Sequence, residues 1–160
     1  METPTHFHFS YRRMVEFADT DLAGIVHFAN FFRYMECAEH AFFRSLGFHV
    51  HTTQGSAQHG WPRLDVTCKY LRPARFEQTL EIRLRIEEIR TSSLRYGFWI
   101  FGEGEKPHSP LAVGSCTIIY VELDTASHQI RKAPIRAELR AKIEEILASS
   151  PAIPSTPHAP

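Results

Sequence analysis

The segment from about residue 27 to residue 46 constrains the fold more than any other part of the sequence. Its apolar residues recur at steps of three and four, and polar residues occupy the opposite side. This period predicts a helix of about five turns with a wide aromatic face, which Gly47 ends in the usual C-terminal position. Such a face requires a large apolar surface to cover it. The apolar positions are Phe28, Phe31, Phe32, Met35, Ala38, Phe42 and Leu46.

Strand-like segments on both sides of this helix can supply that surface. Apolar and polar residues alternate over 9–17, 63–70 and 80–87, which indicates strands with one buried face. Residues 94–101 and 111–122 are apolar on both faces, as in central strands. A last helix is expected from Pro134, which suits a first helical position. Its apolar stripe is Ile135, Leu139, Ile143 and Ile146 or Leu147.

This order of elements, without βα alternation, predicts an α+β domain in which one antiparallel sheet curves around the long helix. We expect residues 1–148 to form a single domain and the proline-rich residues 149–160 to form a loose tail. A sheet of this kind leaves two edge strands. Because edge strands commonly pair across a two-fold axis, a homodimer is the expected form.

Composition excludes several classes of function. The 160 residues carry 18 Lys+Arg and 18 Asp+Glu, so the chain lacks the basic excess of a nucleic-acid-coating protein. No apolar run approaches the roughly 18 residues of a membrane span, and no signal peptide is evident. The three cysteines form no CxxC motif, so reduced thiols and a cytoplasmic location are expected. His6-x-His8 and His49-x-His51 have a spacing that could hold a metal, but no third ligand is evident, and no dinucleotide fingerprint is present, so we expect no metal and no cofactor.

The chemistry is concentrated just before the long helix. Asp19 and Asp21 precede the helix N-terminus, and Gly24 lets backbone or ligand approach closely there. The end of a helix presents unpaired N–H groups that can hold an oxyanion, while a carboxylate can attack an acyl carbon or activate water. The two aspartates could equally cap a turn and a helix, which is a common place for Asp.

The same stretch resembles the 4-hydroxybenzoyl-CoA thioesterase family of the hotdog fold. The family motif runs roughly D-x-D-x-x-G-x-V-x-x-x-x-[YF]-x-x-[YFW], and the likeness in element order covers residues 11–122. The resemblance implies a long helix wrapped by an antiparallel sheet. It also implies a dimer or a dimer of dimers, with active sites at the subunit interface. The matching residues are Asp19, Asp21, Gly24, Val26, Phe31 and Tyr34.

The resemblance assigns roles to individual residues. Asp21 would be the catalytic carboxylate, as nucleophile or as general base, and the backbone N–H of Phe28 would be the oxyanion donor. Asp19 would be structural, and Gly24 would lie against the substrate. His27, next to the donor, would contact substrate or carry a proton; alternatively its ring only shapes the mouth of the pocket.

The resemblance also implies two further candidates for substrate binding. Glu36 would meet the ring of an aromatic acyl group from the second subunit, or would simply pair with His40 or solvent. By position, the segment Arg90-Thr91-Ser92 is similar to the family's loop that contacts the CoA phosphates, and Arg suits phosphate geometry. Alternatively this segment is an ordinary exposed hairpin.

The first hypothesis is therefore a thioesterase that hydrolyses an aromatic or medium-chain acyl-CoA to the free acid and CoA, without a metal or redox cofactor. A second hypothesis, on the same fold, is a hydratase or dehydratase of acyl thioesters that uses His27 and Glu36. A third is a non-catalytic module that binds acyl-CoA or acyl carrier protein. All three require an acyl thioester as partner, and none involves nucleic acid or a membrane.

Overall fold

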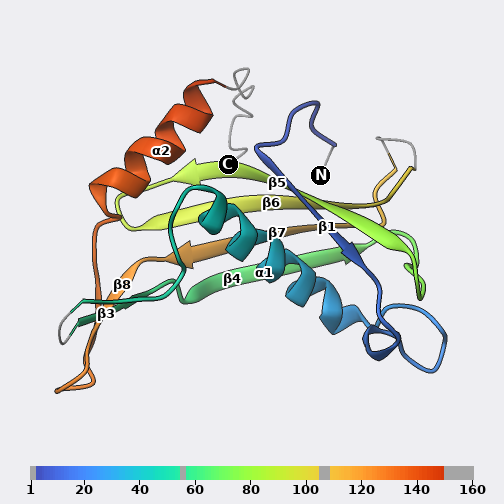
Figure 1. Ribbon diagram of the computed structural model, residues 1–160, viewed down its shortest axis with the longest axis horizontal. Coiled ribbons are helices and arrows are strands. Elements are labelled where there is room, and N and C mark those ends of the chain that lie inside the picture. Colours follow the sequence, from blue (N-terminus) through green and yellow to red (C-terminus); the bar gives the residue numbers. More distant parts are fainter. Residues whose placement is uncertain (1–2, 55–56, 105–108, 150–160) are drawn as a thin grey trace, which may run out of the picture.

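The computed structural model describes residues 3–54, 57–104 and 109–149. Its main sheet is antiparallel, and its strand order is β1-β5-β6-β7-β4. A long helix, α1 (Phe28–Ser45), lies diagonally across one face of this sheet (Figure 1). The five strands are β1 (Phe9–Met14), β4 (Arg63–Tyr70), β5 (Thr79–Ile89), β6 (Ser93–Gly102) and β7 (Ala112–Ile119).

Helix α1 begins and ends where the sequence predicts. His27 is its N-cap, and the ring Nδ1 accepts a hydrogen bond from the Ala29 N–H at 3.3 Å. Gly47 follows the C-terminus with a φ of +81°, a conformation that favours glycine. The predicted first strand is shorter than expected, because residues after Met14 leave the sheet and form a 3-10 turn, η1 (Phe17–Asp19).

The buried face of α1 forms the centre of the core and differs in part from the prediction. Phe28 was expected to be buried, but it is 59% exposed because it lies in the first turn. Phe32 and Leu46 are only partly buried. Phe31, Met35, Ala38 and Phe42 are buried as predicted, and Tyr34, Glu39 and Phe43 are buried in addition.

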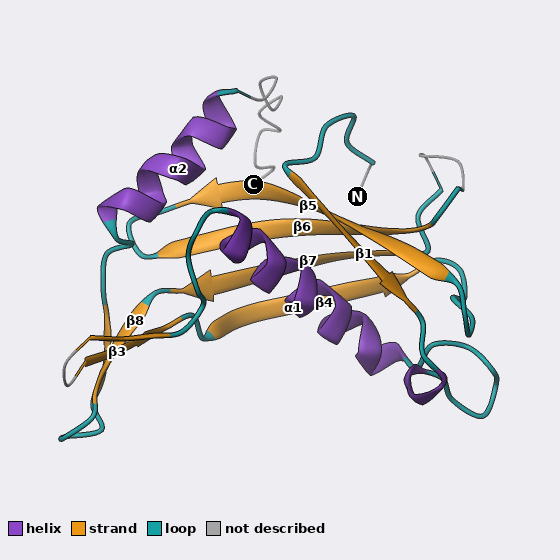
Figure 2. Ribbon diagram, in the orientation of Figure 1, coloured by secondary structure: helices purple, strands orange, loops and turns teal. Residues whose placement is uncertain are grey.

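The structure contains a second, smaller sheet, whereas the sequence predicts a single sheet. The predicted continuous strand over 111–122 is also wrong, because it is divided between the two sheets. The strand breaks at Tyr120, whose N–H donates to the Ser92 carbonyl and whose carbonyl accepts from the Ala133 N–H. The chain then enters the second sheet, which Figure 2 shows beyond one end of the first. Its order is β2-β3-β8-β9, formed by β2 (Thr52–Gln54), β3 (Ala57–Gly60), β8 (Val121–Asp124) and β9 (Ile130–Lys132).

The C-terminal helix, α2 (Ala137–Ala148), starts three residues later than Pro134, the expected start. Its predicted apolar stripe is confirmed: Leu139 and Ile143 are buried, and Ile146 and Leu147 pack against the core. The predicted tail falls mainly on residues 150–160, which lie outside the described residues. None of the described helices combines the length and the apolarity that crossing a membrane requires.

Strand β4 is an open edge of the main sheet. Its only neighbour among the described strands is β7, so its other side offers unpaired backbone groups. The alternation of residues 63–70 predicts one buried face, yet Leu64, Val66 and Tyr70 are 62%, 40% and 44% exposed. The apolar face of β4 is thus only partly covered in a single copy of the chain.

Gly114 sets how closely α1 approaches the sheet. A Cβ at this position would lie 2.5 Å from Sδ of Met35 on α1 and 2.7 Å from the Thr67 carbonyl oxygen. We expect Gly114→Ala to lower the free energy of unfolding by about 2 kcal/mol, because one added carbon overpacks this contact. Denaturant unfolding measures the change. Gly60→Ala is the control, since a Cβ added there would have no atom within 4 Å, and equal effects of the two variants would contradict the prediction.

Candidate active site

Asp19 holds the segment between β1 and α1 in place. It is buried, and its Oδ2 accepts a hydrogen bond from the Glu16 N–H at 3.1 Å and lies 3.6 Å from the Arg13 guanidinium. Its backbone carbonyl accepts from the His27 N–H and from Nδ2 of Asn30. These contacts tie the end of β1 to the first turn of α1, as expected of a structural aspartate.

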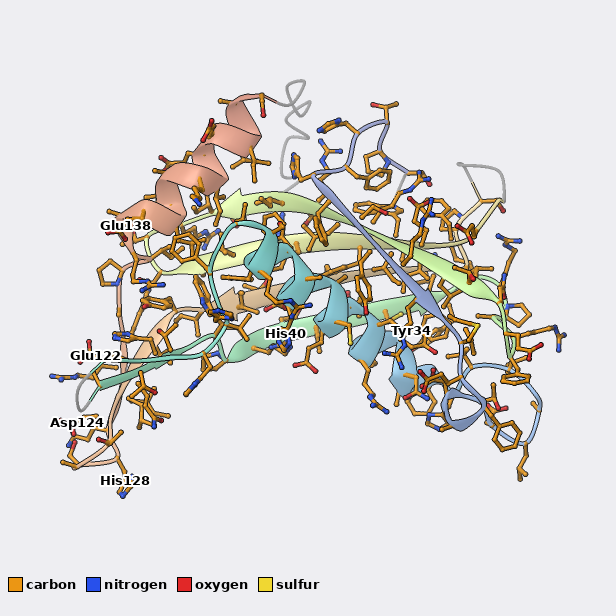
Figure 3. All side chains as sticks on the ribbon, viewed as in Figure 1. Tyr34, His40, Glu122, Asp124, His128 and Glu138 are labelled. Carbon is orange, nitrogen blue, oxygen red and sulfur yellow. The ribbon has the colours of Figure 1, made fainter. Side chains whose placement is uncertain are left out.

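Tyr34, the last position of the sequence motif, supports the same anchor. Its ring is fully buried, and the Arg13 guanidinium lies 5.2 Å from the ring centre. Burial, together with the neighbouring Asp19 carboxylate, raises the pKa of the Tyr34 hydroxyl well above its usual range. Figure 3 shows Tyr34 on the half of α1 that lies towards η1. Tyr34 therefore belongs to the group of residues, with Arg13 and Asp19, that holds the segment before α1 in place.

Asp21 lies two residues after this anchor and is exposed. Its Oδ1 accepts a hydrogen bond from the Ala23 N–H at 2.8 Å, and the Gly24 N–H donates to its backbone carbonyl at 2.9 Å. Gly24 has a φ of +71°, so this tight turn favours glycine. Among the described residues, no group donates to Oδ2 of Asp21. One oxygen is thus held and the other is available.

The first turn of α1 leaves one N–H group available beside Asp21. The Ala29 N–H donates to the ring of His27, and the Asn30 N–H donates to the His27 carbonyl. Within the described part of the chain, the Phe28 N–H has no acceptor. The Tyr70 hydroxyl donates to the Phe28 carbonyl at 3.2 Å, which fixes this residue to the end of β4. The partial positive charge of the helix N-terminus adds to this donor.

Asp21 and Phe28 line the same pocket, which has a volume of about 450 Å³. Its walls are mostly apolar and include Phe31, Tyr70 and Leu71. Asp21 and His27 also border a larger hollow, of about 770 Å³, together with Phe17 and Phe76. A carboxylate and an unpaired N–H in one apolar recess can serve attack on a carbonyl carbon and stabilisation of its oxygen.

Glu36 lies outside this pocket in the same protomer. It is eight residues after Phe28, about 12 Å along the helix axis. Its carboxylate pairs with Arg63 at 3.1 Å rather than with His40. His27 and Glu36 therefore do not face each other within one protomer, as the hydratase hypothesis would require.

Arg90, Thr91 and Ser92 form the turn between β5 and β6, as predicted. Ser92 is buried, the Thr91 carbonyl accepts from the Ile135 N–H, and the exposed Arg90 pairs with Glu88 at 2.8 Å. The Asp21 loop lies near the start of β5, because the Val26 N–H donates to the Ala74 carbonyl. The eleven residues of β5 span about 35 Å. Within one protomer this turn and Asp21 thus lie at opposite ends of the sheet.

Sequence reasoning did not single out Glu39, the most unusual carboxyl group of the structure. Glu39 is 1% exposed, and its Oε2 lies 3.1 Å from the Arg63 guanidinium, which also pairs with Glu36. Burial raises the pKa of Glu39 to about 7; Arg63 opposes this shift and Glu36 adds to it. Glu39 lies four residues after Met35 and three before Phe42, so this spacing places it on the apolar face of the helix. A charged residue on that face is the sequence signal that could have identified Glu39.

Comparisons with known proteins agree on one family. The family model described as "Thioesterase-like superfamily" matches residues 15–143. A curated protein of Aquifex aeolicus named "Putative esterase" is 35% identical over 95 residues, which cover 59% of this chain and 73% of its own length. The 1,4-dihydroxy-2-naphthoyl-CoA hydrolase of Thermosynechococcus vestitus is 28% identical over 94 residues, 59% of this chain and 64% of that relative, less than two thirds of its length.

Solved structures confirm the predicted hotdog fold. A 1,4-dihydroxy-2-naphthoyl-CoA thioesterase from Synechocystis superposes with a TM-score of 0.71 at 19% identity, over 86% of this chain and 96% of that chain. A gentisyl-coenzyme A thioesterase superposes with a TM-score of 0.65 at 26% identity, over 82% of this chain and 96% of that chain. The first likeness concerns the fold alone.

The raised pKa of Glu39 predicts a specific pH dependence of stability. Between pH 4.5, the usual pKa, and about 7, the folded state keeps a proton that the unfolded state releases. Stability is therefore lost as the pH rises through this window, by about 3 kcal/mol in total. Because glutamine stays neutral, the difference in unfolding free energy between wild type and Glu39→Gln should change by this amount. Urea unfolding at several pH values measures it.

The exposed Glu138 on α2 supplies the control for this measurement. The Glu138→Gln variant should keep the pH dependence of the wild type. A Glu39→Gln variant that follows the wild-type curve from pH 4.5 to 7.5 would contradict the prediction.

Proposed function

The chain belongs to the thioesterase-like superfamily, and from this membership we propose that it hydrolyses an acyl-CoA thioester to the free acid and CoA. At the level of the family, it is a thioester hydrolase. We propose an aromatic or medium-chain acyl group as its substrate. The aromatic choice is supported by the rings of Phe28, Phe31 and Tyr70 in the pocket and by relatives that are named for naphthoyl and gentisyl thioesters.

One observation carries this proposal: Asp21 and Phe28 line one pocket, and among the described residues the Phe28 N–H has no acceptor. The thioester carbonyl oxygen would accept from the Phe28 N–H, so that its carbon faces Asp21. Negative charge that develops on this oxygen is then stabilised by the N–H and by the helix N-terminus. His27 has only Nε2 left for the substrate, because its Nδ1 caps the helix.

Two routes use the same residues. In one, an Asp21 oxygen bonds to the carbonyl carbon, the C–S bond breaks and CoA leaves as the thiolate; water then hydrolyses the mixed anhydride. In the other, Asp21 takes a proton from water, whose oxygen bonds to the carbon before the C–S bond breaks. The thiolate takes up a proton in either case. Both routes need only the carboxylate, the N–H and water, so we propose a reaction without metal or redox cofactor.

We further propose that the active form is a homodimer joined along β4, or a pair of such dimers. The exposed apolar face and the open edge of β4 support this pairing. Two-fold antiparallel pairing would place the Tyr70 end of one strand beside the Arg63 end of the other. Glu36 and the Arg90 turn of the second protomer would then approach Asp21 of the first, where they could meet the acyl ring and the CoA phosphates.

The three free cysteines support the proposal that the protein acts in the cytoplasm, where thiols stay reduced.

Replacing the proposed catalytic carboxylate tests the chemistry. Asp21→Asn should lower kcat by about 10³-fold, because the amide neither attacks nor accepts the proton. Release of free thiol is measured with a hydroxylated aromatic, a short aliphatic and a long aliphatic acyl-CoA. Asp124→Asn is the matched control, because its Oδ1 also accepts backbone N–H bonds, from Ala126 and Ser127, in an exposed turn. Unchanged activity of Asp21→Asn would show that this residue takes no part in the reaction. A wild-type protein that binds acyl-CoA without releasing free thiol would indicate a binding module.

The dimer is tested on the same edge strand. Leu64→Asp should convert the dimer to a monomer and lower kcat/KM at least tenfold, because it places charge in an apolar interface and separates the composite site. Sedimentation analysis and thiol release measure the two effects. Ile130→Asp on β9 is the control, since Ile130 is 64% exposed and Leu64 is 62% exposed. A Leu64→Asp variant that remains dimeric would exclude this edge as the interface.

A further inference from the structure

The peptide group that carries the Phe28 N–H is fixed in direction. Its carbonyl belongs to His27 and accepts a hydrogen bond from the Asn30 N–H at 2.9 Å. Because the N–H and C=O groups of a trans peptide point in opposite directions, this bond also sets where the Phe28 N–H points. Asn30 is itself tied to the loop before α1, since its Nδ2 donates to the Asp19 carbonyl at 2.8 Å.

The next peptide group, between Phe28 and Ala29, is held at both edges by side chains. The Tyr70 hydroxyl donates to the Phe28 carbonyl at 3.2 Å. Nδ1 of His27 accepts from the Ala29 N–H at 3.3 Å. One of these side chains comes from the end of β4 and the other from the residue before α1. We call this pair of hydrogen bonds the peptide clamp.

Both clamping side chains are themselves held by ring contacts. The Tyr70 ring lies 5.4 Å from the Phe31 ring in an edge-on arrangement. The His27 ring lies 4.4 Å from the Phe28 ring. These contacts restrict the rotation of both side chains, so the clamp is ordered before a substrate binds.

The clamp requires one protonation state of each side chain. Since Nδ1 of His27 accepts a hydrogen bond, the ring is neutral and carries its proton on Nε2. A protonated ring donates from both nitrogens and cannot accept from the Ala29 N–H. The Tyr70 hydroxyl must keep its proton in order to donate. Burial and the neighbouring Cys68 raise the pKa of Tyr70, so it stays a donor at neutral pH.

The charged groups beside the clamp are those of the candidate active site. Asp21 borders the hollow that His27 lines, and Arg72 lines the pocket together with Tyr70. Asp19 faces His27 with its backbone carbonyl, which accepts from the His27 N–H at 2.9 Å. Both sides of the clamp thus lie at the proposed active site.

We propose that His27 and Tyr70 are positioning residues of the active site. Through the Phe28–Ala29 peptide they hold the first turn of α1 in the conformation that directs the Phe28 N–H to the thioester carbonyl. The Tyr70 hydroxyl and Nδ1 of His27 act on the backbone and not on the substrate. The effect on rate rests on the proposed hydrolysis, whereas the clamp itself is tested without a substrate.

Removing the Tyr70 hydroxyl tests one side of the clamp. Tyr70→Phe keeps the ring as a wall of the pocket, so it should lower kcat about tenfold and leave KM for a hydroxylated aromatic acyl-CoA unchanged. Tyr11→Phe on β1 is the control, because Tyr11 lines neither the pocket nor the hollow at Asp21. A raised KM with an unchanged kcat would assign the Tyr70 hydroxyl to substrate binding and overturn the proposal.

Two substitutions of His27 test the other side. Asparagine is a preferred N-cap whose side-chain oxygen accepts a backbone N–H without titrating. His27→Asn should therefore keep kcat within about twofold of the wild type at neutral pH, whereas His27→Leu should lower it about tenfold. An Asn variant as slow as the Leu variant would contradict the capping role.

The pH profile separates a clamp from a merely structural contact. Imidazole gains its proton between about pH 5 and 8, so the kcat of the wild type should fall as the pH decreases through this range. In His27→Asn the fall should begin only at about pH 4, where carboxylates titrate. His128→Asn is the control, because Figure 3 shows His128 in the turn between β8 and β9, away from α1. An acid limb that stays unchanged in His27→Asn would overturn the proposal.

The double variant tests whether the two side chains act on one peptide. Because loss of either bond frees the same group, Tyr70→Phe combined with His27→Leu should lower kcat about tenfold in total. Independent contributions would multiply to about a hundredfold, and that result would exclude a shared clamp.

NMR spectra test the clamp without hydrolysis. The His27 ring of the full-length protein should carry its proton on Nε2, and the Ala29 amide signal should shift in Tyr70→Phe, although the tyrosine bonds only to the other edge of that peptide. A proton on Nδ1, or an Ala29 signal that does not shift, would overturn the clamp. The expected spectra in a wild-type protein that releases no thiol would support the clamp and contradict only the hydrolase proposal.

Discussion

Packing of α1 against the main sheet determines where the candidate site lies. The helix presents aromatic residues over a wide arc, and the sheet receives Met35 only because Gly114 has no side chain. This close approach fixes the helix axis relative to the strands. The first turn of α1 then lies beside the loop that carries Asp21, and its second half carries Glu39 to the Arg63 guanidinium. The position of the Asp21 pocket therefore depends on this packing contact.

Features that follow from a local period could be predicted from the sequence. The helix over 27–46 and the alternation of Leu80 and Ile82 in β5 depend on neighbouring residues, and the structure confirms them. The group formed by Asp21, Gly24, His27 and Phe28 is also local, because eight consecutive residues span a turn and a helix start. The structure brings these residues to one loop, while their catalytic roles stay predictions.

What the sequence could not predict depends on contacts between distant residues. The strands of the second sheet have three or four residues each, too few for a period to be recognised. The ion pair of Arg63 with Glu39 joins residues 24 positions apart, so neither side chain indicates its partner. The exposure of Leu64 and Val66 depends on the position of β4 at the sheet edge, although their alternation resembles that of β5. Glu36 and Arg90 lie away from Asp21 within one protomer, because eight residues of α1 and the length of β5 separate them from it. Their meeting with Asp21 would require a second copy of the chain.

The proposed oxyanion donor is a main-chain group, and this has a consequence for how the protein tolerates change. A catalytic side chain is lost by a single substitution, but the Phe28 N–H is present whichever side chain is encoded at that codon, with proline as the one exception. The exposed Phe28 ring is thus free to vary and to adapt the pocket to a new acyl group. Proline is well accommodated at the first position of a helix, so it would delete the donor and leave the fold in place. Drift at this codon therefore alters selectivity far more readily than it removes the chemistry.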